Sequence, residues 1–336
     1  MTDALLRTRT ADAPRVWFAT PARLIGFLAD SRELTLIVLI AALSVAMSIA
    51  YPNNFLDWYN FSAVMLNAAQ TGILVTGMML LMIAGMFDLS IGSTLAFSGV
   101  IAGALVAWWR VPAEFAVLGG IAAGALFGAI NGFIVTRVRV NALIATLATM
   151  AIYRGVTQLV SGTGITPIGP SFSAYGQSMF LGLQTPFWVM LVVVVAGGWA
   201  VARTRFFRQF YFIGGNARAA QLSGIRVQRL TLIAFVIMGA LAGLAGVLGA
   251  ARLNSAVVTA GIGIELSVIT AAVLGGASLR GGEGSVLGGV LGVLFIALVQ
   301  NALIINGVGV FWQNIIIGSV LLLAVSLDRF KQVQRG

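Results

Sequence analysis

The sequence predicts an all-α polytopic membrane protein of about ten transmembrane helices with both termini in the cytoplasm. The first observation is composition: 59% of the 336 residues are hydrophobic, 9% are charged, and the mean hydropathy is +1.00. The second is that apolar runs able to cross a hydrocarbon core of roughly 30 Å recur along the chain. The third is that basic residues gather in every second gap between these runs.

Apolar periodicity and length predict one transmembrane domain, residues 34–327, between two cytoplasmic tails, residues 1–33 and 328–336. The N-terminal tail spreads its arginines over too long and polar a stretch for the n-region of a cleaved signal peptide. The predicted spans, in order, are residues 34–50, 61–85, 90–109, 115–136, 141–160, 186–202, 230–251, 262–279, 284–305 and 310–327.

The basic residues support this count independently of hydropathy. With the N-terminus inside, 17 of the 20 Lys and Arg residues lie in cytoplasmic tails and loops, including Arg137, Arg139, Arg280 and the run from Arg203 to Arg229. A count wrong by one span would scatter these charges over both faces, against the positive-inside rule. A nucleic-acid-binding protein would instead gather them on one soluble face.

A short internal repeat indicates how the spans are arranged. "FDLSIGS" at 87–93 and "IELSVIT" at 264–270 each place an acidic residue, Leu and Ser before an apolar run. They lie five spans apart, so the second copy would be inverted relative to the first. Many transporters use such an inverted repeat of five helices to build a pathway near the membrane midplane.

Asp88 and Glu265 are the acidic residues of this repeat, and two interpretations apply to them. In the functional one, Asp88 and Ser90 hold an interrupted segment beside a pathway, where hydroxyls satisfy freed backbone groups. In the structural one, which the sequence favours, Asp88 is a helix N-cap at the cytoplasmic membrane edge, and Glu265 caps the eighth span on the opposite face. Neither arrangement resembles a buried ion relay.

Uncharged polar residues inside the spans indicate the chemistry of a cargo. They could bind a polyhydroxylated neutral solute without fixed charge, and for each one a hydrogen bond between helices is the alternative. Glycine repeats at 119–132 and 239–250 predict seams of close helix packing. The polar residues are Asn67, Gln70, Thr71, Asn131, Asn141, Thr146, Thr149, Gln300 and Asn301.

Residues 203–229 form the longest predicted cytoplasmic break. Asn216 can cap a short helix through "ARAAQL", and Gly224 can end it. Ala219, Ala220 and Leu222 would give this helix a small apolar face that fits a partner's groove. By composition alone, an idle interfacial helix fits equally well.

Several functions are excluded by what the sequence lacks. It has no Cys and no His, so it offers no disulfide, no thiol nucleophile, no thiolate metal site and no neutral-pH proton shuttle, and no residue is predicted to bind a metal. It has no paired acids at catalytic spacing, so no residue is predicted to be catalytic. Its one lysine is Lys331 and no Gly-x-x-x-x-Gly-Lys-Ser/Thr occurs, so the chain is not itself a P-loop ATPase.

Four motifs in order resemble the permease subunits of bacterial ABC sugar importers, the ribose, xylose, rhamnose and autoinducer-sugar type. They are "GMFDLSIGSTLAFSGVIAGAL" (85–105), "VNALIATLATMAIYRGVTQLVSG" (140–162), "IGGNARAAQLSGI" (213–225) and "AAVLGGASLRGGEGSVLGGVLG" (271–292). The resemblance covers roughly residues 35 to 330. Ala142 and Leu143 stand where many relatives have Pro-Phe, and Ala148 replaces a Gly, so local helix geometry can differ.

The resemblance implies an inner-membrane transporter subunit that carries a neutral sugar. A second permease copy or a sister permease would complete the pathway, a periplasmic binding protein would deliver the sugar, and a separate cytoplasmic subunit would bind ATP, so this chain needs no cofactor. The loop 161–186 is the candidate contact for the binding protein. Residues of the coupling segment that would contact the ATPase are Gly214, Gly215, Asn216, Ala219, Ala220, Ser223 and Gly224.

Two other functions stay open. An ion-coupled secondary transporter would need a titratable or cation-binding group within the membrane, and the absence of His and the acids at span ends argue against it. A branched-chain amino acid permease of the same superfamily is closer. The Asp-Leu-Ser-x-Gly and Gly-Gly-Asn-x-x-Ala-Ala motifs favour a sugar permease.

Overall fold

The computed structural model of the protein describes residues 32–333, and each of the ten predicted spans contains a helix. The bounds follow the apolar runs to within a few residues at most ends, because turn residues and polar residues interrupt those runs. The helices are α2 (Arg32–Ala50), α4 (Trp58–Ile83), α5 (Ile91–Ala107), α6 (Ala113–Phe133), α7 (Ala142–Ser161), α9 (Thr185–Arg203), α12 (Val227–Leu253), α13 (Ile264–Leu274), α14 (Val286–Ile305) and α15 (Val310–Val333).

Among the described residues, seven helices are long and apolar enough to cross a membrane: α2, α4, α6, α7, α9, α12 and α14. Helices α5 and α13 are apolar but shorter. The protein is therefore a polytopic helical membrane protein.

Short elements fill the connections. Two small antiparallel ribbons form, β1 with β4 and β2 with β3. The short elements are α3 (Pro52–Phe55), the π-helical turn η1 (Ile134–Val138), β1 (Gly164–Ile165), α8 (Pro170–Gln177), β2 (Met179–Phe180), β3 (Leu183–Gln184), α10 (Arg205–Gly215), α11 (Ala217–Leu222) and β4 (Ala256–Val257).

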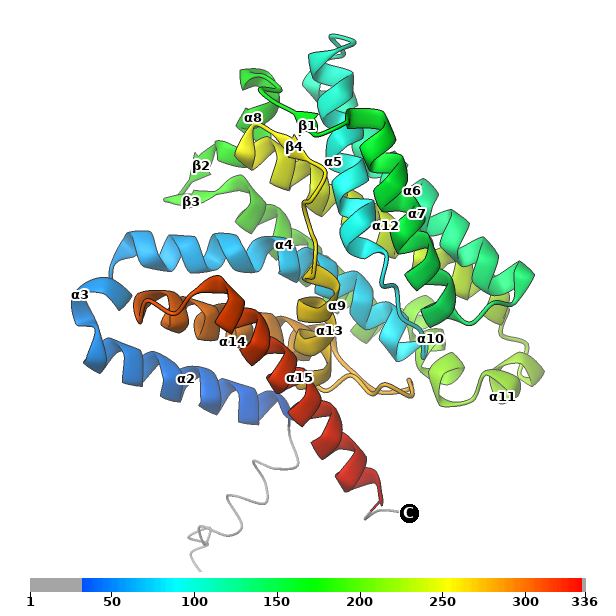
Figure 1. The fold of residues 1–336 in the computed structure, drawn as a ribbon. Helices are drawn as coiled ribbons and strands as arrows, with labels where there is room; N and C mark the ends of the chain where they lie inside the picture. The colour runs from blue at the N-terminus through cyan, green and yellow to red at the C-terminus, as the bar shows by residue number, and fades with distance from the viewer. Residues whose placement is uncertain (1–31, 334–336) are drawn as a thin grey trace, which may run out of the picture.

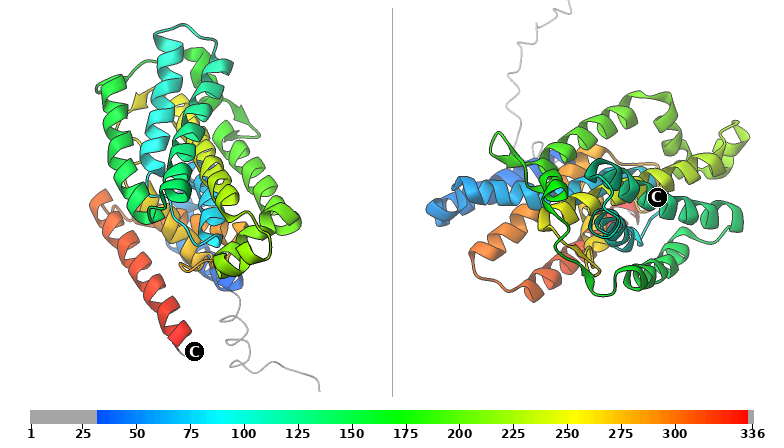
Figure 2. Two further views of the ribbon diagram at one scale, coloured as in Figure 1. Left: turned by 90° about the vertical axis from the view of Figure 1, so that its right-hand side faces the viewer. Right: turned by 90° about the horizontal axis from the view of Figure 1, so that it is seen from above.

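Helix α4 lies at the centre of the bundle. Its second half, from Gly72 to Ile83, is buried throughout, as expected of a helix that is apolar on every face. It packs against α9, α12, α13 and α14, while α5, α6 and α7 group around α12 on one side and α2 and α15 lie on the other. Helix α2 is mostly exposed, and α15 lies at the edge of the bundle (Figures 1 and 2).

The two glycine repeats pack against each other, so the predicted seams are confirmed. A Cβ atom at Gly239 of α12 would overlap the carbonyl oxygen of Gly124 in α6 and lie 2.8 Å from Cα of Gly128. A Cβ at Gly124 would lie 2.7 Å from Cα of Gly243. Only glycine lets the two backbones approach this closely.

The structure differs from the sequence-based prediction at two helices, and part of the prediction lies outside the described residues. The eighth predicted span, 262–279, holds a helix of only 11 residues, because Gly263 caps α13 and Gly275 and Gly276 end it, Gly276 with φ +96°. Helix α15 continues past residue 327 to Val333. Except for its last two residues, the predicted N-terminal tail lies outside the described residues, as do residues 334–336.

Candidate functional site

A cavity of about 530 Å³ lies between α4, α13, α14 and α15, and its polar lining is uncharged. Asn67 and Thr71 come from α4, Ser267 from α13 and Gln300 from α14. Asn67 and Thr71 are four residues apart, so they share one face of their helix. The remaining described lining residues are apolar or glycine, and none is titratable.

One wall of the cavity is formed where α13 begins, after a segment of consecutive turns. Residues 258–263 run from β4 to α13 without regular strand or helix structure, and residues 261–264 line the cavity. Figure 1 shows this connection running from β4 along the inside of the bundle to α13. Gly261, with φ +71°, packs against Gly92 at the start of α5, where its Cβ would lie 3.1 Å from Cα of Gly92.

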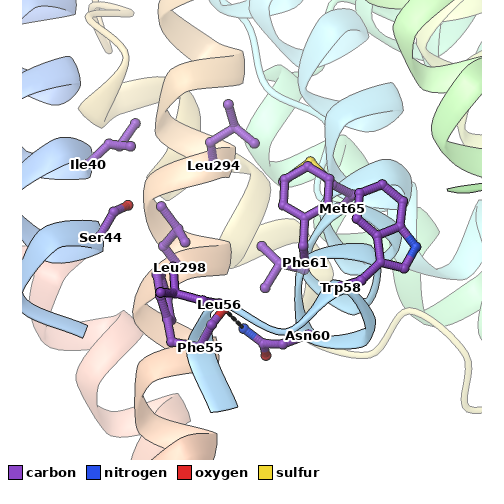
Figure 3. Close-up of a pocket in the computed structure, with 11 residues that line it drawn as sticks. Ile40, Ser44, Phe55, Leu56, Trp58, Asn60, Phe61, Met65, Leu294 and Leu298 are labelled. Atoms are coloured by element: carbon purple, nitrogen blue, oxygen red, sulfur yellow. Dashed lines mark hydrogen bonds between the residues drawn. The ribbon is translucent and has the colours of Figure 1, made fainter. Parts of the chain in front are cut away.

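A second pocket, of about 480 Å³, has a less polar lining than the first cavity (Figure 3). It lies between α2, the α3 turn, α4 and α14, and most of its described lining residues are apolar, with a hydroxyl at Ser44 and an amide at Asn60. The Asn60 side-chain amide donates to the carbonyl oxygen of Phe55 at 3.0 Å and exchanges hydrogen bonds with Asn301 of α14. With Asn60 already paired, this pocket fits hydrocarbon rather than a polar solute.

Of the polar residues predicted within the spans, Asn67, Thr71 and Gln300 line the cavity, while others lie elsewhere. Gln70 faces a separate small pocket and donates to the carbonyl oxygen of Ala245 at 3.2 Å. Asn141 caps α7, accepting from the Leu143 amide at 2.9 Å. Thr146 is fully buried and donates to the Ala142 carbonyl within its own helix.

Asp88 and Ser90 belong to a buried polar network outside the cavity. Asp88 is 1% exposed, and its Oδ1 accepts from the backbone amide of Ser90 at 2.8 Å and from its hydroxyl at 2.6 Å. Asn131 of α6 donates to Ser90 Oγ at 2.8 Å and accepts from the Tyr153 hydroxyl at 2.9 Å. The network therefore ties the start of α5 to α6 and α7.

The favoured interpretation of Asp88 as a helix N-cap is not what the structure has. The N-cap of α5 is Ser90, and Asp88 lies two residues earlier, in an Asx-type turn. Asp88 is in the connection between α4 and α5, where burial raises its pKa, while its hydrogen bonds with Ser90 and Asn131 lower it. The Asp88 carboxylate is buried against Asn131 of α6, a contact that the local sequence does not reveal.

Glu265 lies in the first turn of α13, after the N-cap Gly263, and makes no side-chain capping bond. A Cβ at Gly92 would lie 3.0 Å from Glu265 Oε2. The two copies of the internal repeat therefore meet, which contradicts their prediction as caps on opposite faces. Gly261, in the turn segment 258–263 just before the second copy, packs against Gly92 of the first.

The predicted short helix of the coupling segment is confirmed as α11. The Asn216 side chain caps it by accepting from the Ala219 amide at 3.0 Å, and Gly224 follows it with φ +87°. Ala219 and Leu222 are exposed on this helix, and Leu222 is 80% exposed; Ser223, which follows it, is exposed as well. Ala220 is buried in the core, so it is not part of an exposed apolar face as predicted.

The sequence-based prediction did not include α10, which immediately precedes α11. Its amphipathic pattern buries Phe210 and Ile213, and the Tyr211 hydroxyl donates to the Gly284 carbonyl at 2.8 Å. Gly214 lies where three backbones meet: its Cβ would overlap Ile83 and Gly282. The end of α4, the end of α10 and the loop 280–284 thus form one glycine-rich junction.

The loop 161–186 is tied to the segment that leads to the cavity. β1 pairs with β4, and the Gly169 amide donates to the Asn254 side chain at 2.9 Å. Gln177, on α8, donates to the carbonyl oxygen of Arg252 at 2.9 Å. This loop is therefore ordered by contacts with residues 252–257.

A family model described as "Branched-chain amino acid transport system / permease component" matches residues 60–325. The chain belongs to this permease family. The ribose import permease protein RbsC of Escherichia coli is 39% identical over 304 residues, covering 89% of this chain and 93% of that protein. The L-arabinose ABC transporter permease protein AraH of Azospirillum brasilense is 35% identical over 337 residues, covering 100% and 98%.

A third relative of this permease, the ribose import permease protein RbsC of Bacillus subtilis, is 39% identical over 293 residues, covering 86% and 90%. Members of the family are transport components, so the chain is not an enzyme.

Sequence reasoning did not single out Ser267, although it lies in the internal repeat. Its place in the cavity lining depends on how α13 packs, and its position in the repeat was the available signal.

Proposed function

We propose that this chain is the permease subunit of an ABC importer in the bacterial inner membrane, and that the cavity is its part of the path for a neutral sugar. The observation that carries the proposal is the cavity's uncharged polar lining. Sugar hydroxyls need hydrogen-bond partners when they leave water, and amide and hydroxyl side chains supply both donors and acceptors. The names of the relatives, ribose and arabinose permeases, agree with this chemistry.

The other two candidate functions have less support. Ion coupling would require a titratable or ion-binding group beside the solute, and the described lining residues include no titratable one. A branched-chain amino acid would bring a charged ammonium and a carboxylate to side chains that carry no charge. The relatives reported above are sugar permeases, so the amino acid in the family description does not decide the cargo.

The proposal includes partners. A separate ATPase subunit would bind ATP and contact the coupling segment at α11, where Ala219 and Leu222 are exposed, and at Gly215, the exposed last residue of α10. A second permease copy or a sister permease would close the path, since the cavity lies near α15 at the edge of the bundle. A periplasmic binding protein would deliver the sugar to the loop 161–186.

We also propose ten membrane spans built as an inverted repeat of five. The support is that helix contacts occur in matching pairs five spans apart. Helix α12 packs on α5 and α6, and α4 correspondingly packs on α13 and α14; likewise α5 contacts α7, and α13 contacts α15. An even number of spans, together with the arginine distribution, puts both termini in the cytoplasm.

Sugar uptake by variants of the cavity lining tests the proposed path. Cells without their own ribose and arabinose importers would express the complete transporter and receive radiolabelled ribose or arabinose. Gln300→Leu and Asn67→Leu are expected to lower uptake about tenfold or more, since each removes a polar partner of the sugar. Gln70→Leu is the matched control, because Gln70 lies outside this cavity. Unchanged uptake in both cavity variants would contradict the proposal.

A further inference from the structure

Arg154 makes an unusual contact for a charged residue in a transmembrane helix. It lies on α7, is partly buried, and points one guanidinium nitrogen at two backbone carbonyl oxygens. The Arg154 Nη1 donates to the carbonyl of Val258 and, at 2.9 Å, to that of Ala260. Placing a charged side chain within the membrane costs free energy unless the charge is paired or hydrogen-bonded, and such residues commonly have a function.

The two carbonyls belong to the segment 258–263, which forms one wall of the cavity. Within the described residues, the other hydrogen bonds of this segment are local ones, such as those from the Ala260 amide to Val257 and from the Ile262 amide to Thr259. These local bonds do not attach the segment to the helices around it. Arg154 attaches it to α7.

The ends of this segment are fixed in different ways. On one side, β4 is held by its pairing with β1. On the other, the segment leads directly into α13, which packs against α4 and α14. The hydrogen bonds from Arg154 lie between these two attachments, where the chain has glycines at 261 and 263 with positive φ. Glycine permits many backbone conformations, so an external contact is needed to select one.

We propose that Arg154 is a positioning residue of the permease, which holds residues 258–263 in place as the wall of the cavity. Its relevance to transport rests on the proposed function, in which the cavity is the sugar path. The loop 161–186 reaches the same segment through β1 and β4, so α7 and this loop together set the shape of the cavity's rim. Arg154 does not line the cavity itself.

The natural absence of cysteine makes the proposal measurable without transport. Ser267→Cys places a single thiol in the cavity, and a membrane-impermeant maleimide reports its accessibility in right-side-out membrane vesicles containing the complete transporter. Adding Arg154→Gln is expected to raise the labelling rate about tenfold, because a hydrogen bond from a charged donor shifts an equilibrium by at least that factor. Arg110→Gln, a change in the α5–α6 connection, is the matched control.

An unchanged or slower labelling rate in Arg154→Gln would overturn the proposal. Arg154→Lys keeps the charge on a shorter side chain without the planar guanidinium, so it is expected to label at an intermediate rate, and a rate equal to the parent's would also overturn it. Arg154→Lys keeps the test possible if the Arg154→Gln protein does not insert into the membrane. Labelling does not depend on which solute is carried, so failure of this inference is distinguishable from failure of the proposed sugar path.

Discussion

Asp88 and its partners Ser90, Asn131 and Tyr153 form a polar network that stays outside the cavity. All four side chains are buried, and each makes at least one hydrogen bond within the group. A satisfied network of this kind stabilises one arrangement of helices, while an unsatisfied one costs free energy. The hydrogen bonds of Asp88 therefore tie the residues before α5 to its N-cap Ser90, and the network ties Ser90 to α6.

Substitution of Asp88 separates a structural function from one in the pathway. Asp88→Ala is expected to lower the free energy of unfolding by about 1–3 kcal/mol, because it leaves the Ser90 amide and hydroxyl without their acceptor. Asp88→Asn retains an oxygen for Ser90 and should cost less. Thermal unfolding in detergent measures the loss. The sugar concentration for half-maximal uptake should stay constant, and a change in it without a loss of stability would make Asp88 a pathway residue.

Local residue features could be predicted from the sequence, and features that depend on distant contacts could not. Asn216 caps α11 as predicted, because a cap needs only the next three residues. Asp88 was assigned the same local function, but its environment is set by Asn131, 43 residues later. Thr71 and Gln300 were recognised as polar residues within spans, yet their meeting across one cavity depends on helix packing.

At the scale of elements, α11 presents an exposed apolar side chain of the coupling segment on an ordered helix. Leu222 is 80% exposed although it is apolar, and α11 is fixed by its cap and by the buried Ala220. Exposed apolar side chains on an ordered helix are typical of a contact surface.

Leu222→Arg is therefore expected to reduce the amount of ATPase subunit that copurifies with the tagged permease, because a charge would have to be buried in the contact. Quantitative mass spectrometry of the mildly solubilised complex measures the ratio. Leu181→Arg is the control, since Leu181 is also strongly exposed but lies in the β2–β3 hairpin. Equal loss in both variants, or none in either, would refute docking at α11.

The glycine seam between α6 and α12 gives a second prediction at this scale. Gly239→Ala is expected to lower the free energy of unfolding by roughly 1–3 kcal/mol, because the new methyl group would overlap the α6 backbone. Gly155→Ala is the matched control: no heavy atom lies within 4 Å of its Cβ position, so the change should be neutral or stabilising. Thermal unfolding of both variants in detergent is the measurement, and equal stability would refute the seam.

The sequence predicted long helices better than short ones. Spans such as α12 and α14 follow uninterrupted apolar runs, whose length alone indicates a helix. Helix α13 was predicted too long, since apolar residues continue beyond the glycines that end it. Helix α10 was missed because it mixes arginines with aromatics, a pattern that becomes recognisable as helical only when Phe210 and Ile213 are seen buried.

At the scale of the whole molecule, the matching helix contacts explain why the two copies of the repeat meet. Each copy follows a long central helix, α4 or α12, and each central helix packs on the other half's third and fourth spans. An inverted repeat brings equivalent segments together at its pseudo-two-fold axis. The contact between Gly92 and Gly261 fits this arrangement, as does the cavity wall formed beside it.

The proposed topology predicts which single cysteines an impermeant maleimide can reach in intact spheroplasts. Ser178→Cys follows the fifth span and should react from outside, whereas Ser223→Cys follows the sixth and should react only after permeabilisation. Thr2→Cys and Gln334→Cys should behave like Ser223→Cys, because ten spans return the chain to the side where it began. Both Ser178 and Ser223 are exposed, so a lack of reaction means that the membrane blocks the maleimide, not that the side chain is buried.

Opposite behaviour of Thr2→Cys and Gln334→Cys would mean an odd number of spans. The five-plus-five inverted repeat would then be wrong, whereas the cavity lining would be unaffected.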